Sequence, residues 1–258
     1  MAIPKIIHYC WFGEKEMSDL DKECLASWKK YLPDYEFKFW NEDNFDVTQS
    51  NYVRQAYEQN HFVFVSDYLR WYALSNYGGM YMDLDIEVLQ NLDEFLENNH
   101  TFLGFETQRF IGTGIVGTEK GSWISKKMFN YYDTHDFVNV DGNIDTTASV
   151  QIMLPFLEEK GFVSENKEQI VGDIHVYERD IFFPKKLDDD HFRTTDRTVT
   201  IHKFEGTWLT EREKKRGTNK FWINVCRPVL RKTRSVITKV MGKKKAKRIE
   251  AALREKIR

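Results

Sequence analysis

Two carboxylates interrupt an otherwise apolar stretch of the chain, Gly78–Val88, and they constrain the fold more than any other feature. Asp83 and Asp85 are one residue apart in a sequence with strand character, so in a strand both would project from the same face. Two like charges in apolar surroundings are costly unless protonation or a cation neutralises them. Oxygen ligands favour Mg²⁺ or Mn²⁺. The spacing alone leaves two interpretations open, a divalent metal site or a strand end whose acids are solvated.

The segments before this motif alternate between strand and helix patterns. A buried strand is expected within Ile3–Phe12, a helix from Ser18, and a second strand over Tyr35–Trp40. This order predicts a βαβ unit with parallel strands. A further helix is expected over Ser66–Tyr77, with Gly78 as its left-handed stop.

The later segments continue the α/β pattern. The expected strands are Met80–Val88, Phe102–Glu106, Ile111–Val116 and Thr198–Phe204, and the expected helices are Trp123–Tyr132 and Thr146–Lys160. Ligands of open α/β sheets bind at the carboxyl ends of strands, which is where the Asp-x-Asp (DxD) motif would lie. We therefore expect an α/β domain over residues 1–226 and a separate segment, residues 227–258.

Charge divides the chain into an acidic body and a basic tail. Arg227–Arg258 contributes 13 basic and two acidic residues, whereas Met1–Cys226 contributes 25 basic and 38 acidic residues. Apolar residues recur along the tail, which predicts a basic amphipathic helix at a membrane surface, where each Lys or Arg contributes about 1 kcal/mol. The tail lacks the aromatic interleaving of nucleic-acid-binding segments, so no nucleic-acid partner is expected. A solvated helix, or one packed on a partner chain, is the alternative.

Cysteines and apolar runs bear on the cellular compartment. Cys10, Cys24 and Cys226 lack paired spacing, which indicates reduced thiols. No apolar run reaches the length of a membrane span, and Ile3–Phe12 lacks a signal-peptide cleavage site. These features predict a cytoplasmic protein, peripheral on the inner face of the plasma membrane through residues 227–258.

Other polar groups add to the metal interpretation. Asp67 and Arg70 share a helix face and could hold the hydroxyls of a polar ligand, with a surface ion pair as the alternative. His202, near the end of a late strand, offers a nitrogen ligand, although lone histidines are more often structural. Trp208 could stack on a ligand ring, or lie in the core with its N–H bonded.

Together these segments resemble family 32 of the DxD-motif glycosyltransferases, especially the bacterial capsular polysaccharide enzymes. More distantly, the chain is similar to yeast Golgi mannosyltransferases and clostridial glucosylating toxins. The matching elements are Ile3-Pro4-Lys5-Ile6-Ile7-His8-Tyr9-Cys10-Trp11-Phe12-Gly13, Ser27-Trp28 with Pro33, Trp40-Asn41, Ser66-Asp67-x-x-Arg70, Gly78-Gly79-x-Tyr81-x-Asp83-x-Asp85 and His202 to Trp208. The last element carries Thr207 where the family usually has serine. About residues 112–151 and the basic tail lie outside the resemblance.

The resemblance implies a GT-A (Rossmann-like) nucleotide-sugar-binding fold and a retaining, Mn²⁺- or Mg²⁺-dependent hexosyltransferase. It implies transfer of a hexose or N-acetylhexosamine, with UDP-galactose favoured as donor, to a glycan or lipid-linked oligosaccharide in capsular or other surface polysaccharide synthesis. Retention would follow from front-face attack by the acceptor. A covalent glycosyl-enzyme would instead need a far-face carboxylate, for which Glu106 and Asp145 are candidates.

The resemblance also implies a role for each matching residue. Catalytic roles would fall to Asp67, Arg70, Asp83 and Asp85, nucleotide-sugar binding to His8, Tyr9, Trp11, Asp67, Arg70, Asp83 and Trp208, and metal binding to Asp85, His202 and Asp83. Asp85 would bind the metal directly, whereas Asp83 would contact donor hydroxyls or water on the metal.

Two other functions are compatible with the residues. Metal-dependent phosphohydrolases also use D-x-D strands, with Asp83 then as nucleophile, but they carry the motif on the first strand. A non-catalytic membrane-surface adaptor would tolerate replacement of Asp83 and Asp85 by asparagine, whereas a transferase would not.

Overall fold

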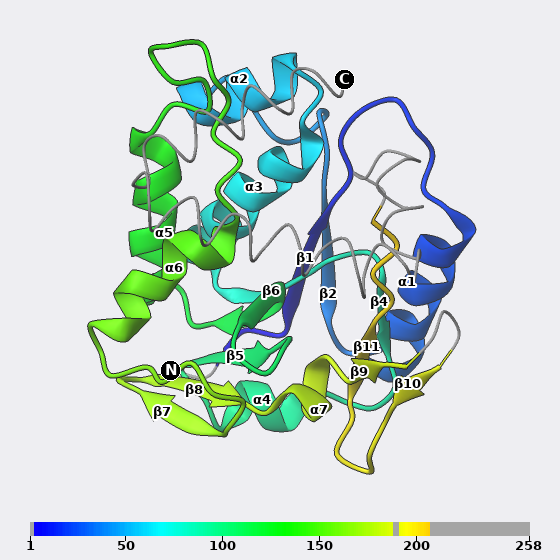
Figure 1. The fold of residues 1–258 in the computed structure, drawn as a ribbon. Coiled ribbons are helices and arrows are strands. Elements are labelled where there is room, and N and C mark those ends of the chain that lie inside the picture. Colours follow the sequence, from blue (N-terminus) through cyan, green and yellow to red (C-terminus); the bar gives the residue numbers. More distant parts are fainter. Residues whose placement is uncertain (1–2, 188–190, 207–258) are drawn as a thin grey trace, which may run out of the picture. The chain divides into compact units, whose positions relative to one another are not determined.

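The computed structural model describes residues 3–187 and 191–206 of the chain. A mixed sheet of seven strands forms its centre, in the order β2-β1-β3-β6-β5-β8-β7 (Figure 1). The strands are β1 (Ile6–Cys10), β2 (Glu36–Trp40), β3 (Gly79–Met82), β5 (Thr101–Phe105), β6 (Ile111–Thr118), β7 (Gln169–Val171) and β8 (Ile174–Tyr177). The predicted α/β class is confirmed.

The predicted βαβ unit opens the chain. The first helix, α1 (Asp19–Tyr31), begins after Ser18, whose side chain accepts a hydrogen bond from the Asp21 amide while the Asp21 carboxylate accepts one from the Ser18 amide. β1 pairs in parallel with β2 and β3, whereas β6 runs antiparallel to β3 and β5, and β5 is parallel to β8. The carboxyl ends of β1, β3, β5 and β8 therefore meet at one edge of the sheet, together with the start of β6.

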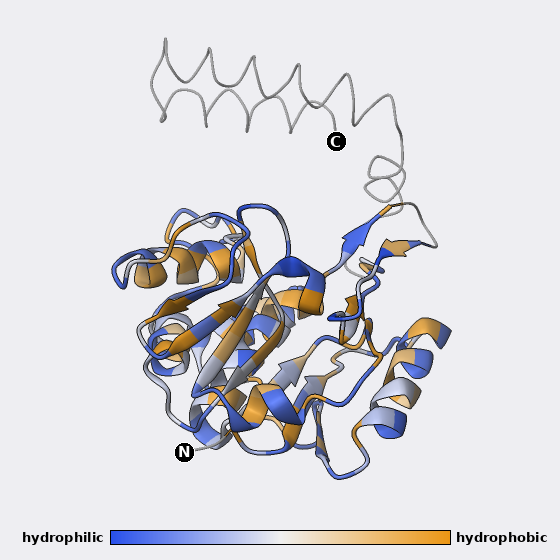
Figure 2. Ribbon diagram, turned by 90° about the horizontal axis from the view of Figure 1, so that it is seen from below, coloured by the Kyte–Doolittle hydropathy of each residue, from blue (hydrophilic) through white to orange (hydrophobic). Residues whose placement is uncertain are grey.

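Helices cover both faces of the sheet, and each face has its own hydrophobic core. The other helices of the described residues are α2 (Asn51–Glu58), α3 (Phe62–Tyr77), α4 (Asp93–Glu97), α5 (Trp123–Thr134), α6 (Ser149–Glu158) and α7 (Arg179–Phe182). α2, α3, α5 and α6 share a core with Tyr81, whereas α1, α4 and α7 share the other with Met80 and Met82. Alternation along β3 thus divides the two cores, and the covering helices carry both hydrophobic and hydrophilic stretches (Figure 2).

The run predicted as one strand over Met80–Val88 is instead two strands joined by a turn. β3 ends at Met82, and the Ile86 amide donates to the Asp83 carbonyl at 3.2 Å before β4 (Ile86–Val88) begins. β4 pairs antiparallel with β11 (Thr200–His202) in a separate two-stranded sheet. The single-strand prediction was wrong because aspartate is disfavoured in strands and favoured in turns. The turn moves the acids to the sheet edge, and the register places His202 opposite Ile86.

Other predicted elements are present with shifted ends. α3 begins at Phe62 rather than Ser66 and ends before Gly78, whose φ is positive at 70° as expected, although its ψ of -166° is not left-handed helical. The last predicted strand is reduced to β11. The short helices α2, α4 and α7 were not predicted, since few turns give a weak periodic signal.

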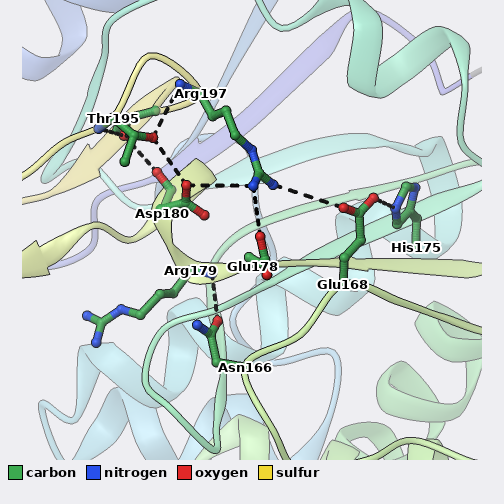
Figure 3. A network of polar contacts seen from close by, with 9 residues as sticks. Asn166, Glu168, His175, Glu178, Arg179, Asp180, Thr195 and Arg197 are labelled. Atoms are coloured by element: carbon green, nitrogen blue, oxygen red, sulfur yellow. Dashed lines mark hydrogen bonds and ion pairs between the residues drawn. The ribbon is translucent and has the colours of Figure 1, made fainter.

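A polar network fastens the chain that leads into β11 (Figure 3). Arg197 Nη1 lies 2.8 Å from Glu178 Oε2 and 3.9 Å from Asp180 Oδ2, and Arg197 Nη2 lies 4.0 Å from Glu168 Oε2. Glu168 Oε1 lies 2.6 Å from His175 Nε2 on β8. The connection also contains a small sheet of β9 (Lys185–Lys186) and β10 (Phe192–Arg193). Exposed ion pairs contribute little individually, but this network links α7, β8 and the approach to β11.

Some predictions fall outside the described residues: the roles of Thr207 and Trp208, the domain boundary at 226/227 and the amphipathic helix of 227–258. Up to Glu205 the chain forms one compact unit. In the part that the structure describes, no helix is both long enough and apolar enough to cross a membrane.

Candidate active site

Neighbouring segments hold the acidic turn on both sides. The Asp83 amide donates to the Gly114 carbonyl of β6 at 2.8 Å. After β11, the Lys203 amide donates to the Asp85 carbonyl at 2.9 Å, and the Glu205 amide donates to Asp85 Oδ2 at 3.0 Å. The position of Asp85 therefore depends on a segment more than a hundred residues later in the chain.

His202 reaches the acid pair from β11. Its Nε2 lies 3.1 Å from Asp85 Oδ1, and its ring centre lies 4.0 Å from that of Phe204 and 5.9 Å from that of Phe183. Burial alone would lower the pKa of His202, but the hydrogen bond and charge of Asp85 raise it above its usual value. The other ring nitrogen, Nδ1, is buried and has no hydrogen-bond partner among the described residues.

Asp83, Asp85 and His202 suit a divalent cation. One possible ligand atom from each lies within 4.8 Å of the other two, which no other group of three in residues 3–187 and 191–206 matches. Gly114 keeps the space beside them clear, because a Cβ there would lie 2.9 Å from Asp83 Oδ2 and 3.3 Å from His202 Cε1. The unpartnered Nδ1, this clearance and the donor set of two carboxylates and an imidazole fit a bound metal ion.

The two acids differ in their electrostatic surroundings. Burial acts to raise the pKa of Asp85, but His202 and the Glu205 amide outweigh it and lower the pKa below its ordinary value. Burial raises the pKa of Asp83, which Arg70 offsets only in part and the charge of Asp85 reinforces. Asp85 is therefore the more readily ionised of the two acids.

Arg70 links the acidic turn to α3. One guanidinium nitrogen, Nη1, contacts Asp67 and the other, Nη2, lies 3.2 Å from Asp83 Oδ1. The guanidinium carbon lies 4.5 Å from the ring centre of Tyr81, and only 5 % of the Arg70 side chain is exposed. Asp67 and Arg70 are therefore a buried pair joined to the acid site, and not the surface ion pair of the alternative interpretation. In this arrangement Arg70 positions Asp67 and Asp83.

The residues predicted to line the nucleotide pocket lie in different environments. Both ring nitrogens of His8 are engaged, since Nε2 donates to the Gly78 carbonyl at 2.8 Å and Nδ1 accepts from Trp40 Nε1 at 3.2 Å. His8 is fully buried, and this burial lowers its pKa to about 4. Tyr9 packs edge-on against Trp28 in a core. His8 thus holds strands together instead of facing a ligand.

Trp11 is the one of these three that is partly exposed, and it follows β1 directly. Its position at the sheet edge that also carries the acidic turn suits the predicted contact with a base. Of the two carboxylates considered for the far face, Glu106 follows β5 at this edge, whereas Asp145 accepts hydrogen bonds from the amide and hydroxyl of Thr147 at 2.9 and 2.6 Å.

Sequence reasoning missed Gly114 and the role of Tyr81 beneath Arg70. The alternating glycines of Ile111–Thr118 could have indicated the first, because glycine in a strand often marks a close approach of other groups. No sequence pattern beyond the Gly78–Asp85 motif indicates the contact of Tyr81 with Arg70. The late position of His202 is explained only by the β4–β11 pairing.

Comparison with known proteins supports this location of the site. Residues 18–102 match the family described as the glycosyltransferase sugar-binding region containing the DXD motif. Inositol phosphoceramide mannosyltransferase 3 of Schizosaccharomyces pombe is 29% identical over 102 residues, and mannosyltransferase 2 of the same organism is 34% identical over 99 residues. Each match covers 37% of this chain and 28% of the relative, so the aligned part is about a quarter of those proteins.

Some solved structures also show a distant likeness to this chain. They include the PaToxG glycosyltransferase, with 17% identity, a TM-score of 0.42 and coverage of 61% of this chain and 70% of that chain. The galactosyltransferase LgtC, solved with donor and acceptor sugar analogues, has 14% identity, a TM-score of 0.42 and coverage of 80% and 90%. The matched residues 18–102 contain α1, α3 and the Asp83–Asp85 turn, so the turn lies within the stretch that is similar to this family.

Proposed function

We propose that this protein is a GT-A glycosyltransferase that moves a sugar from a nucleotide diphosphate donor to a glycan acceptor. The observation that carries the proposal is the Asp83–Asp85–His202 group at the DXD motif of the matched region, in which His202 Nδ1 has no hydrogen-bond partner among the residues that the structure describes. A divalent cation at these residues, Mn²⁺ or Mg²⁺, would neutralise charge that develops on the leaving diphosphate.

The chain's own residues supply binding and orientation. Asp85 contacts His202 and accepts a hydrogen bond from the Glu205 amide, and these contacts hold the Asp85 side chain in place. Arg70 fixes the carboxylates of Asp67 and Asp83, which can then accept hydrogen bonds from donor hydroxyls. We propose transfer with retention by front-face attack, in which the leaving phosphate oxygen takes the proton of the acceptor hydroxyl.

The finer assignments come from sequence resemblance and from the relatives' names. Family habit favours UDP-galactose, whereas the two S. pombe relatives are named mannosyltransferases, so a nucleotide-linked mannose is a second candidate donor. Those names also include inositol phosphoceramide, a lipid, which supports a lipid-linked acceptor. We propose that residues 227–258 bring the enzyme to the inner face of the plasma membrane, for capsular or other surface polysaccharide synthesis.

Hydrolysis of nucleotide sugars with Mn²⁺ tests the activity without knowledge of the acceptor. UDP-galactose, UDP-glucose, their N-acetyl forms and GDP-mannose form the donor panel, and p-nitrophenyl phosphate tests for a phosphohydrolase. We expect Asp85→Asn to lower hydrolysis by at least about 100-fold, since a metal ion contributes several kcal/mol to such a barrier. The fold should remain intact by circular dichroism.

Asp136→Asn, an exposed aspartate away from the turn, is the matched control and should retain wild-type hydrolysis. Wild-type hydrolysis by Asp85→Asn would overturn the metal assignment. Turnover of p-nitrophenyl phosphate without consumption of any nucleotide sugar would overturn the transferase assignment.

A further inference from the structure

A third carboxylate approaches the site from β5. Glu106 follows β5 directly, and its amide donates to the Phe110 carbonyl at 2.9 Å, which fixes the backbone at the start of the β5–β6 turn. Its side chain is mostly buried. Among the described residues its carboxylate makes no hydrogen bond and no ion pair. Burial raises the pKa of Glu106, and the charges of His202 and Arg179 oppose this shift without cancelling it. Because a desolvated carboxylate without a hydrogen bond is costly, a ligand is the simplest reason for its presence.

Two glycines of β6 bring Glu106 beside Asp83. A Cβ at Gly112 would lie 3.0 Å from Glu106 Oε2, and a Cβ at Gly114 would lie 2.9 Å from Asp83 Oδ2. Positions i and i+2 share a strand face, and their Cα atoms are roughly 7 Å apart. The two carboxylates thus lie over neighbouring positions of one face. Glu106 is not part of the group whose ligand atoms lie within 4.8 Å, so it lies beside the candidate metal site and not in it.

Arg179 lies near Glu106 from the end of β8. Its Nε donates to the Phe183 carbonyl at 3.3 Å, and within the described chain its terminal amino groups have no partner. Burial lowers the pKa of Arg179, and the charge of Glu106 opposes this shift. The guanidinium points away from the Arg197 network (Figure 3). The charges of Glu106 and Arg179 influence each other, but among the described residues the two side chains form no ion pair within 4.0 Å.

We propose that Glu106 contacts the sugar substrate, its carboxylate accepting a hydrogen bond from a sugar hydroxyl while Arg179 donates to the same sugar. This inference rests on the proposed glycosyl transfer. Along the sheet edge, Trp11 follows β1, Asp83 follows β3 and Glu106 follows β5. A donor whose base lies at Trp11 and whose diphosphate lies at the candidate metal site would direct the reacting sugars toward Glu106. Carboxylates accept hydrogen bonds from hydroxyls, and Arg donates in a fixed fork.

Glu106→Gln in the full-length protein tests the contact and separates the two possible sugars. The donor measurement is Mn²⁺-dependent hydrolysis of the nucleotide sugar that the wild type uses best, compared with affinity for the matching nucleoside diphosphate, which lacks the sugar. The acceptor measurement is transfer to methyl α-galactoside, α-glucoside and α-mannoside relative to hydrolysis. We expect Glu106→Gln to lower kcat/KM by at least 10-fold in either the donor measurement or the acceptor measurement. Its affinity for the nucleoside diphosphate should stay within twofold of that of wild type. If the wild type uses none of the acceptors, the donor measurement decides alone.

Matched controls come from the network of Figure 3. Glu178→Gln is the control for Glu106→Gln, and Arg197→Gln is the control for Arg179→Gln. Arg179→Gln should lose activity in the same measurement as Glu106→Gln. The thermal midpoint of Glu106→Gln should equal or exceed that of wild type, since an unpaired desolvated charge is removed. Lower activity without lower stability distinguishes substrate contact from a structural role.

Two results would overturn the inference: wild-type kinetics of Glu106→Gln for donor and acceptor alike, or a loss of Mn²⁺ affinity as large as that of Asp85→Asn. Failure of the proposed function would look different. In that case the wild-type protein itself would turn over no nucleotide sugar, and the assignment of Glu106 would fall with it.

Discussion

At the residue scale, the positive charge of Arg70 explains how Asp67 and Asp83 can lie close together in a largely buried site. Its guanidinium lies between Asp67 and Asp83 and over the Tyr81 ring. Burial would lower the pKa of Arg70, but the two carboxylates raise it, so the side chain stays charged. The cation offsets part of the repulsion that Asp83 meets from Asp85, before any metal ion is bound.

Replacement of Arg70 by glutamine should therefore destabilise the fold as well as the site. Removal of one partner from a buried ion pair costs about 3–5 kcal/mol, because the remaining charges stay desolvated. Urea denaturation of the purified variant measures this cost. Arg54→Gln, which breaks the exposed Arg54–Glu58 pair, should cost less than about 1 kcal/mol. Similar losses of unfolding free energy in both variants would show that the buried Arg70 contributes no more to stability than the exposed Arg54.

His8 gives the fold a pH dependence that can be isolated. In the folded protein its pKa is about 4, against 6.5 for the free side chain. Between these values the unfolded chain binds a proton that the folded protein does not, so stability is full above pH 6.5 and falls as the pH drops toward 4. From pH 7.5 to 5.0 His8 should account for a loss of about 2 kcal/mol.

His8→Gln removes this titration while keeping a side-chain donor and acceptor for Gly78 and Trp40. Urea denaturation at pH 7.5 and 5.0 should show a smaller loss for the variant than for wild type. Equal losses would mean that His8 is not the group responsible.

At the element scale, local patterns in the sequence predicted much of the fold but not the assembly of the site. The helical pattern that begins at Ser18 is local, and the helix it predicted is present as α1. The break between β3 and β4 was missed, because apolar residues continue through the turn and only Asp83 and Asp85 mark it. The pairing of His202 with Ile86 joins residues far apart in sequence, so no local pattern could show it. The buried place of His8 was likewise set by tertiary contacts with Trp40 and Gly78.

α1 holds β4 in place, and thereby the turn before it. The Trp28 indole N–H donates to the Ile86 carbonyl at 2.6 Å, and the Val88 amide donates to Ser27 Oγ at 2.9 Å. Trp28 is fully buried. Within the described residues β4 pairs with one strand, β11, and these bonds from α1 support it in addition.

Trp28→Phe should leave the Ile86 carbonyl without its buried donor. We expect a loss of about 1–3 kcal/mol from the unpaired group, with a further contribution from lost volume. Mn²⁺ affinity should weaken too, because Ile86 follows Asp85 directly. Trp123→Phe is the control, since its N–H reaches Asp173 at the surface. A stable Trp28→Phe variant with unchanged Mn²⁺ affinity would contradict the role of α1 as support for the turn.

At the scale of the whole molecule, one sheet edge collects the groups that the proposed reaction needs. Trp11, Asp83 and Glu106 directly follow β1, β3 and β5 there, Arg179 begins α7 shortly after β8, and His202 lies on β11, which pairs with β4. The parallel pairs β1–β3 and β5–β8 make this possible, because they place the carboxyl ends of distant segments together. The helices then bury both faces and leave the edge for ligands.

The charge distribution of the whole chain carries the last prediction. Residues 1–226 are acidic and residues 227–258 are strongly basic, so an anionic surface should attract the tail and repel the body. Deletion of Arg227–Arg258 should weaken binding to vesicles that contain phosphatidylserine by at least about tenfold, while donor hydrolysis in solution stays at the wild-type rate. Raising the salt from 50 to 500 mM should release the full-length protein, because screening shortens the reach of its charges. Vesicles of phosphatidylcholine alone are the control and should bind both forms weakly. Equal sedimentation of both forms with anionic vesicles would rule out the tail as the membrane contact and leave a solvated helix, or one packed on a partner chain, as its role.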